Sequence, residues 1–583
     1  MRLPLVLFRR KEKMILVIVI LLSIGYFAYG LYYITNSGLV AGEAKYVSDE
    51  CWYVSAARNL LRKVFGLEPN SCWSGLCYAS VFVNSPEEVN EVEDYVKNHG
   101  GIVVKDNYVH KVLAGYDYTI AVRAPPQVIE ELARNYTVIV GYPYPDWDDV
   151  ANYLNLEHPP LMKYIVMITL LVYDNPVIWK IPSLIAGSLI LFFAYLIAKK
   201  VFSDVAGLLA AIIVFVEPVT RAMSMVAMLD IYVALFSIIA LYFAVKSKYL
   251  FSGISVGLAG SVKMNGFYHV LSIIISAWRN RKISNIKLLL YAIIVPLIVY
   301  VMVNVPIIVY EGGLMKWIDL QLWALSWHTQ SRPPGGPPVA NPWDWFLSRN
   351  SFPLHYNPDL AANPSPPLML LTIPLTIILI PLAWREKIKG AGSVLAWFWI
   401  PIMMFTALFL IGNRTQYSFY SVQVTPIAAI IVSSIVFFVY RRDLFFEAIL
   451  AYKFDQPYRI GLMLLLGLSL WITITYLIPG LMGIVVASVI LGLLIAFGKL
   501  GFKTSIAIGL GAGLLAPIIV YYYYWVNASI ETLKYLEIMF PYNIIPIIAS
   551  MIATTASTMI FMILLGMRHR IEYVEEDFDH WGE

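Results

Sequence analysis

The feature that most constrains the fold of this 583-residue chain is the recurrence of long apolar runs separated by short polar or basic segments. Of all residues, 59% are hydrophobic and 14% are charged, whereas soluble proteins average about 45–50% apolar and about 25% charged residues. This composition excludes a soluble multidomain enzyme and a disordered chain. A net charge of only +4, with the basic residues in short loops, also argues against a nucleic-acid partner.

The apolar runs predict about fourteen transmembrane segments, since a helix needs about 20 apolar residues to cross a bilayer. The first, Met14–Thr35, follows four basic residues and is too long for a signal peptide. The other candidates are 181–199, 205–218, 227–246, 249–261, 265–278, 286–310, 366–384, 393–411, 418–440, 460–477, 480–497, 504–525 and 541–566. The adjacent pair 249–261 and 265–278 is short, and Lys263 interrupts it.

The distribution of basic residues predicts the orientation. Alternate loops are basic: Lys199-Lys200, Lys246/Lys248, Arg279/Arg281/Lys282/Lys287, Arg385/Lys387/Lys389, Arg441-Arg442, Lys499/Lys503 and Arg568/Arg570. With these loops inside, both termini are cytoplasmic, and the large loops 36–180 and 311–365 are extracellular. We therefore expect a multi-pass protein of the cell membrane.

One extracellular segment, 78–142, has the pattern of a small α+β domain. The predicted order is strand Tyr78–Val83, helix Pro86–Asn98, strand Ile102–Val109, strand Tyr118–Arg123, helix Pro126–Arg134 and strand Thr137–Val140. This βαββαβ order is that of a ferredoxin-like fold. The remaining expected units are 14–77 (first helix and start of the first external loop), 143–440 (membrane core with loop 311–365), 441–566 (C-terminal helices) and 567–583 (cytoplasmic tail).

Several ionisable residues fall at the predicted outer ends of the helices, where a charge usually marks a functional cavity. They are Asp49, Glu50, His158, Lys163, Glu217, Arg221, Asp230 and Arg414. Lys263 lies between two short half-helices that meet partway across the membrane, from where it can join them. A carboxylate can take the proton of an attacking hydroxyl, and Lys and Arg can hold a phosphate as it leaves. This chemistry fits transfer from a phospho-linked donor carried in the membrane. By itself it leaves both a membrane enzyme and a transporter open.

The order of motifs resembles the protein O-mannosyltransferases and, more broadly, the lipid-phosphate-dependent glycosyltransferases of the C superfamily. The matching segments are Ser48-Asp49-Glu50, His158-Pro159-Pro160-Leu161-Met162-Lys163, Ile181-Pro182-Ser183-Leu184, Arg221 through Leu229-Asp230, Ser261-Val262-Lys263 with Gly266, His328 with Ser331-Arg332-Pro333, Pro342-Trp343-Asp344-Trp345, and Arg414 with Tyr417, Tyr420 and Pro426. Together they cover roughly residues 14–440.

The resemblance implies an all-α polytopic enzyme that transfers a sugar, mannose by first choice, from a polyprenyl- or dolichyl-phosphate donor. The acceptor is a hydroxyl, Ser or Thr of a protein by first choice, and the anomeric carbon is inverted. It implies that Asp49 is the general base and that Glu50 assists in the acceptor site. It also implies a set of donor-binding residues: His158, Lys163, Arg221, Asp230, Lys263, His328, Arg414 and Tyr417.

Several departures keep alternatives open. Met162 replaces a glycine of the family motif, the 78–142 insert is unusual, and helices beyond about residue 460 exceed the family pattern. A lipid-modifying enzyme of the aminoarabinose-transferase type is one alternative. A transporter and a catalytically dead binding protein are two others. No cofactor is expected; a divalent cation at Asp49 and Glu50 is the less favoured reading.

Three cysteines, Cys51, Cys72 and Cys77, occupy the first external loop. One disulfide with a spare thiol and three buried thiols are equally open from the sequence. The cysteines have no nearby His, so they do not predict a zinc site.

Overall fold

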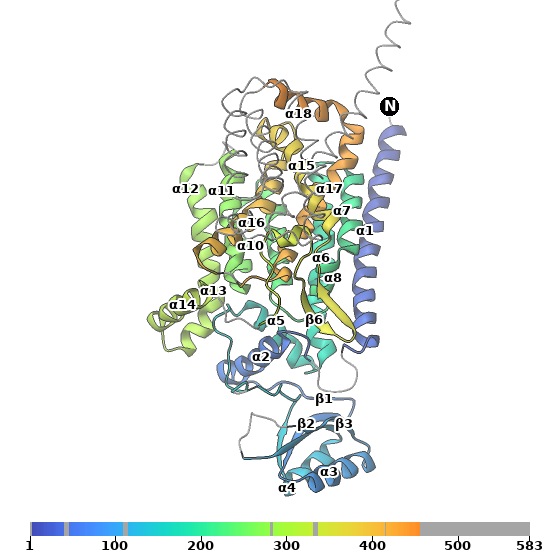
Figure 1. Cartoon of the computed structure of the whole chain (residues 1–583), viewed down its shortest axis with the longest axis vertical. Helices are drawn as coiled ribbons and strands as arrows, with labels where there is room; N and C mark the ends of the chain where they lie inside the picture. Colours follow the sequence, from blue (N-terminus) through green and yellow to red (C-terminus); the bar gives the residue numbers. More distant parts are fainter. Residues whose placement is uncertain are drawn as a thin grey trace, which may run out of the picture.

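The computed structural model describes residues 3–39, 46–108, 115–147, 149–279, 284–329, 336–413 and 415–454. The helices expected after residue 460, Ser331-Arg332-Pro333 and Arg414 lie outside these residues. Within them the chain forms a long helical bundle with a small α+β unit at one end (Figure 1). We call this unit, residues 72–140, the insert, and the adjoining end of the bundle the insert end.

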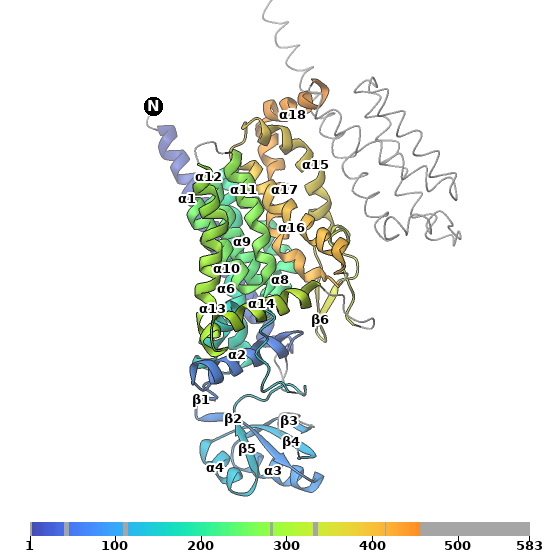
Figure 2. The same cartoon turned by 90° about the vertical axis from the view of Figure 1, so that its left-hand side faces the viewer.

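The bundle consists mostly of apolar helices that run along its long axis, whereas α18 (Arg442–Phe454) lies across the end opposite the insert (Figures 1 and 2). The apolar helices are α1 (Leu3–Asn36), α6 (Pro176–Val201), α7 (Asp204–Val216), α8 (Pro218–Ser224), α9 (Asp230–Val245), α10 (Tyr249–Val262), α11 (His269–Arg279), α12 (Asn285–Leu289), α13 (Val295–Tyr310), α15 (Pro366–Trp384), α16 (Ala391–Ile411) and α17 (Thr425–Tyr440). Among the described residues, five helices are long and apolar enough to cross a bilayer. The bent pair α7–α8 makes a sixth. The chain is therefore a multi-pass membrane protein.

The bundle departs from straight spans at two places that shape its interior. α7 and α8 meet at an angle of 62°. α10 ends at Val262, and a 3₁₀ helix, Met264–Tyr268, follows Lys263, which is where the sequence placed a break. Gly266 packs directly on α10, since a β-carbon there would lie 2.6 Å from the carbonyl oxygen of Ala259. A larger residue at this position would push the two segments apart.

The insert is an antiparallel sheet covered on one face by two helices. It contains β1 (Cys72–Trp73), β2 (Leu76–Val83), α3 (Pro86–Asn98), β3 (Ile102–Tyr108), β4 (Tyr118–Ala124), α4 (Pro126–Asn135) and β5 (Thr137–Val140). The four longer strands lie in the order β5-β2-β4-β3. Ser85 caps α3 by accepting a hydrogen bond from the backbone N–H of Glu88 at 3.2 Å. Apolar residues of β2, β4, α3 and α4 form a separate core.

A disulfide joins Cys72 to Cys77 across the β1–β2 hairpin, and Cys51 is a buried free thiol. Of the two alternatives that the sequence left open, the structure therefore shows the single disulfide with a spare thiol.

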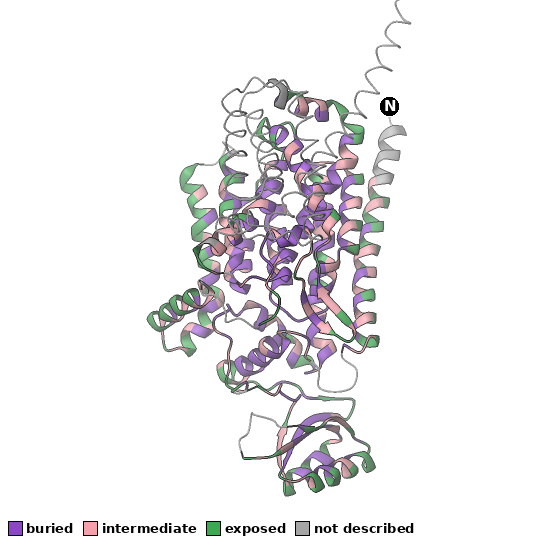
Figure 3. Ribbon diagram, viewed as in Figure 1, coloured by how far each residue is buried: buried purple, intermediate pink, exposed green. Residues whose placement is uncertain are grey.

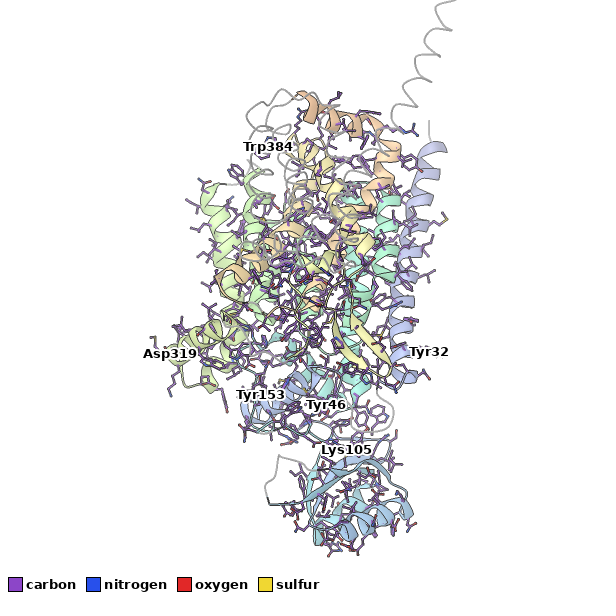
Figure 4. All side chains as sticks on the ribbon, viewed as in Figure 1. Tyr32, Tyr46, Lys105, Tyr153, Asp319 and Trp384 are labelled. Carbon is purple, nitrogen blue, oxygen red and sulfur yellow. A yellow bond between two sulfur atoms is a disulfide. The ribbon has the colours of Figure 1, made fainter. Side chains whose placement is uncertain are left out.

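Short elements fill the insert end of the bundle. They are α2 (Glu50–Phe65), α5 (Leu161–Val172), α14 (Leu314–Thr329), β6 (Phe352–Tyr356) and β7 (Asp359–Ala362). Figure 3 shows that buried residues run through the bundle, whereas α14 and the outer faces of α3 and α4 are exposed. In Figure 4, Tyr46 and Tyr153 lie at the insert end and Trp384 lies near the opposite end.

Candidate functional site

The Asp49-Glu50 pair stands where the chain turns into α2. Ser48 adopts a positive φ of 53°, and Asp49 directly precedes the first helical residue. The Glu50 carboxylate folds back and accepts a hydrogen bond from the backbone N–H of Val47 at 2.8 Å. This local turn holds the Glu50 side chain inside the protein, whereas Asp49 keeps partial exposure.

Glu50 is fully buried and joins three separate segments. Its Oε2 accepts from Lys180 Nζ of α6 at 2.7 Å, and its Oε1 accepts from the backbone N–H of Ala227 at 2.7 Å. Lys180 is also fully buried. A buried carboxylate is stable only when paired and hydrogen-bonded, as it is here. Through these contacts Glu50 holds three segments of the chain together. Its predicted part in binding the acceptor stays a prediction.

Asp230 and Lys263, both expected at the site, form a second buried ion pair. Lys263 Nζ lies 3.0 Å from Oδ1 and 3.1 Å from Oδ2 of Asp230. The same ammonium lies 4.1 Å from the centre of the Tyr420 ring, a cation–π contact. The break after α10 makes this pair, because it places Lys263 in extended backbone facing the start of α9.

Tyr53 of α2 connects the two carboxylate sites. Burial raises the pKa of the Tyr53 phenol, and the negative charges of Asp49 and Asp230 raise it further. Both carboxylates therefore lie within electrostatic range of this one hydroxyl. The Tyr53 ring is also 5.9 Å from the His158 ring. His158 therefore packs near Tyr53, and the charges of Asp49 and Asp230 act on the Tyr53 hydroxyl.

His158 and His328, both expected among the donor-binding residues, lie side by side. Their ring centres are 4.9 Å apart. A ring nitrogen of His328, in α14, lies 2.9 Å from the carbonyl oxygen of Glu157. Trp327 packs edge-on against His158 at 6.1 Å. The C-terminal end of α14 therefore covers the 154–158 loop.

Lys163 takes a place that the sequence did not predict. Its ammonium is fully buried and donates to the carbonyl oxygens of Asn155 and of His158, the latter at 2.8 Å. These bonds fasten the 154–158 loop to α5. To contact a donor phosphate, as predicted, Lys163 would have to exchange them. The geometry therefore favours an indirect role for Lys163.

Arg221 is more accessible than the buried cations Lys163, Lys180 and Lys263. It lies on α8, is partly exposed, and has its guanidinium 5.7 Å from the centre of the Tyr29 ring of α1. The buried Glu217 caps α8 by accepting a hydrogen bond from Thr220 N–H at 2.7 Å, and it also accepts from Ser365 N–H at 3.3 Å. The 62° bend between α7 and α8 and this cap together determine the position of Arg221 on α8.

Tyr417 and the Pro-Trp-Asp-Trp segment form an aromatic wall. Tyr417 packs against Phe352 at 5.2 Å and Phe419 at 5.3 Å. Asp344 accepts a hydrogen bond from Asn341 N–H at 2.9 Å, and burial raises its pKa to about 6. Arg414, expected beside Tyr417, lies outside the described residues.

A buried cluster that the sequence did not predict lies at the insert end of the bundle. Arg58 of α2 donates to both oxygens of Asp174, at 2.6 and 2.8 Å, and to the Tyr46 hydroxyl at 2.6 Å. Its guanidinium lies 4.8 Å from the centre of the Trp179 ring. The neighbouring Lys180 reaches Glu50. The amphipathic spacing of Val54, Ala57 and Leu61 was the available signal for α2, but pattern alone does not pair residues over 100 positions apart.

The comparison with known proteins agrees with the site residues described above. Residues 157–305 match the family model of the dolichyl-phosphate-mannose-protein mannosyltransferases. The match confirms the resemblance drawn from the motifs and supports a glycosyltransferase. A search of curated proteins found no significant match.

Two solved structures are similar in part. ArnT from Cupriavidus metallidurans in the apo state has 13% sequence identity and a TM-score of 0.35, over 70% of this chain and 66% of that one. The oligosaccharyltransferase AglB from Archaeoglobus fulgidus has 13% identity and a TM-score of 0.38, over 91% of this chain and 59% of that one. The chain thus spans less than two thirds of either protein, and similarity this low says nothing about its chemistry.

The stretch that matches the mannosyltransferase family contains only some of the candidate site residues. The matched stretch contains His158, Lys163, Arg221, Asp230 and Lys263 but not the Asp49-Glu50 pair. Glu50 is nevertheless bonded to Lys180 and Ala227, two residues inside the matched stretch. The part of the chain that the structure describes contains no group of three or more His, Cys, Asp or Glu residues arranged to hold a metal ion.

Proposed function

We propose that this chain is a membrane glycosyltransferase that moves a sugar from a polyprenyl- or dolichyl-phosphate donor to a hydroxyl acceptor. Mannose and a protein Ser or Thr are the first choices. The observation that carries the proposal is the buried Asp230–Lys263 pair beside Tyr420, together with the packing of His158 against Tyr53 and His328. The family match over residues 157–305 supports it.

The proposed reaction is a single displacement with inversion. The acceptor oxygen attacks the anomeric carbon, its proton passes to the Asp49 carboxylate, and the bond from that carbon to the phosphate oxygen breaks. The products are the glycosylated acceptor and the polyprenyl phosphate. A positioned general base contributes about 10²–10⁴-fold in rate.

The other side chains receive supporting roles in this proposal. Glu50, held by Lys180, sets the turn that aims Asp49. Arg221 and Arg414 hold the leaving phosphate, and their fixed positive charge stabilises it. The Asp230–Lys263 pair, His158, His328 and Tyr417 line the donor site, and Lys163 maintains the loop that carries His158.

No cofactor enters the proposed reaction. A divalent cation at Asp49 and Glu50 is the alternative. Glu50 already receives hydrogen bonds from Lys180, Val47 and Ala227, so few of its lone pairs remain for a metal.

The finer architecture is also part of the proposal. We take the insert as a ferredoxin-like module, since its strand order and two helices fit that fold. We place the site and the insert on the extracellular side and both termini in the cytoplasm, with about fourteen spans in all. The start of α1 and Trp384, next to basic residues in the sequence, lie at the end of the bundle opposite the insert (Figures 1 and 4).

The test follows the sugar. Membranes containing the protein are incubated with radiolabelled polyprenyl-phosphate sugars, and protein and lipid fractions are separated. Label in protein supports the first choice, and label in lipid supports the aminoarabinose-transferase alternative. No transfer from any such donor, with the donor retained or moved across the membrane, would favour a transporter or binding protein and reject the proposal.

A further inference from the structure

α14 presents three different faces along its 16 residues. One face packs on the protein and consists of Trp317, Leu320, Gln321, Ala324, Trp327 and His328. A second face is apolar and exposed; it consists of Leu314, Met315, Ile318, Leu322 and Leu325. A third face carries Lys316, Asp319, Trp323 and Ser326. At 3.6 residues per turn these sets occupy adjoining sectors of the helix.

The exposed apolar face, which we call the α14 stripe, is too open to be part of the core. Met315 is 70% and Leu322 is 61% exposed. An exposed apolar patch of this kind marks contact with lipid or with another protein. The stripe contains no charged residue, which argues against a partner held by ion pairs.

α14 is hydrogen-bonded to the membrane-spanning helix that precedes it. Gly312 and Gly313, with φ of +86° and +127°, form the turn after α13. The indole N–H of Trp317 donates to Asn304 of α13 at 3.4 Å, and the hydroxyl of Tyr300 bonds to Gln321. Figures 1 and 2 both show α14 lying across the insert end of α13 rather than along it.

The stripe continues the lipid-facing surface of that span. α12–α13 belongs to a span over Asn285–Tyr310, and Met302 and Val309 are exposed on it, the latter at 74%. Leu314 and Met315 follow directly after the turn. Trp323, exposed on the third face beside Lys316 and Asp319, is of the type that gathers where the bilayer meets water.

From these observations we infer that α14 is a membrane-surface helix. Its stripe lies among the lipids at the headgroup boundary of the leaflet on the insert side, and Lys316 and Asp319 face water. This is the arrangement of an interfacial amphipathic helix. Because Trp327 and His328 at its C-terminal end contact His158, the bilayer itself helps to hold one wall of the candidate site.

The experiment measures lipid contact along α14 in the full-length protein. Single Ile318→Cys, Leu322→Cys and Asp319→Cys proteins are labelled with an environment-sensitive fluorophore and placed in phosphatidylcholine vesicles with doxyl-labelled lipids. The native disulfide and the buried Cys51 leave the unsubstituted protein as the labelling blank. Val305→Cys on the span and Asp94→Cys on the insert are positive and negative controls.

We expect lipid quenching at positions 318 and 322 at least severalfold stronger than at 319. Shallow doxyl groups should quench positions 318 and 322 more than deep ones, with the reverse at position 305. Equal quenching at 318, 319 and 322 would overturn the inference. So would protection of 322 from both doxyl lipid and aqueous iodide, which would mean that a protein or a second copy of the chain covers the stripe.

A second variant keeps the test decisive if a label itself disturbs the helix. Leu322→Glu in the Ile318→Cys protein should lower lipid quenching at 318 severalfold, whereas Ser326→Glu should leave it unchanged. Equal effects of the two substitutions would again reject a lipid-seated stripe.

Discussion

The insert and the insert end of the bundle differ in what they bury: the first has an apolar core, and the second buries charged side chains. The insert buries valines, isoleucines and leucines and keeps the charges of α3 and α4 outside. The adjoining end of the bundle instead buries Glu50, Lys180, Asp230, Lys263 and the Arg58–Asp174 pair. A core of apolar residues needs no explanation beyond stability. Buried charges are costly, and replacing such pairs with apolar residues is often neutral or stabilising, so their presence points to a demand for position rather than for stability.

The largest expected effect comes from substituting Asp49, the proposed general base. Asp49→Asn should lower transfer by about 10²–10⁴-fold while leaving donor binding nearly intact, because only the proton acceptor is lost. Sugar transfer and donor affinity are measured separately. Asp94→Asn, on the exposed face of α3, is the matched control and should be unchanged. Full transfer by Asp49→Asn would remove Asp49 from the reaction.

The second-largest expected effect is on stability, and it comes from breaking one buried ion pair. Lys180→Met leaves Glu50 buried without its cation, which should cost about 3–5 kcal/mol. Thermal unfolding in detergent reports the loss. The double variant Glu50→Gln/Lys180→Met should recover much of it but not the transfer activity. If the double variant regains transfer as well, the pair does not aim Asp49.

Substitutions of Arg221 and Lys163 should have different effects on stability, because Lys163 is buried and Arg221 is partly exposed. Arg221→Ala should raise the donor KM with little change in Tm, because Arg221 is partly exposed. Lys163→Ala should lower Tm as well as donor affinity, because it releases the 154–158 loop. Substrate titration and thermal unfolding of both variants make the comparison. An unchanged Tm for Lys163→Ala with weakened donor binding would restore its predicted direct contact with phosphate.

The smallest effect belongs to the insert. Ser85→Ala removes the N-cap of α3 and should destabilise that unit by about 1 kcal/mol. Hydrogen exchange should accelerate in α3 and its sheet, while the bundle and sugar transfer remain unchanged. Asn90→Ala, on the exposed side of α3, is the control. Faster exchange in the bundle would show that the two regions are less independent than their cores suggest.

Local signals account for the parts of the fold that the sequence predicted well. The helices Pro86–Asn98 and Pro366–Trp384 and the strand Thr137–Val140 have the predicted boundaries. Prolines at helix starts, the Ser85 cap and alternating strand residues are each read from a few neighbouring positions. The break at Lys263 was predicted in the same way. α14 was not predicted, because it is shorter and less apolar than a membrane-spanning run.

The sequence by itself determined that this chain is a membrane protein. It also determined which segments form its helices and which charged residues lie at the ends of those helices. Only the tertiary structure decided what those charges do. It turned Glu50 toward Lys180, 130 residues away, and set Lys163 against backbone carbonyls. It also brought His328 to His158. The physical reason is that a buried charge must find a partner wherever the packed helices supply one, and sequence spacing carries no record of that choice.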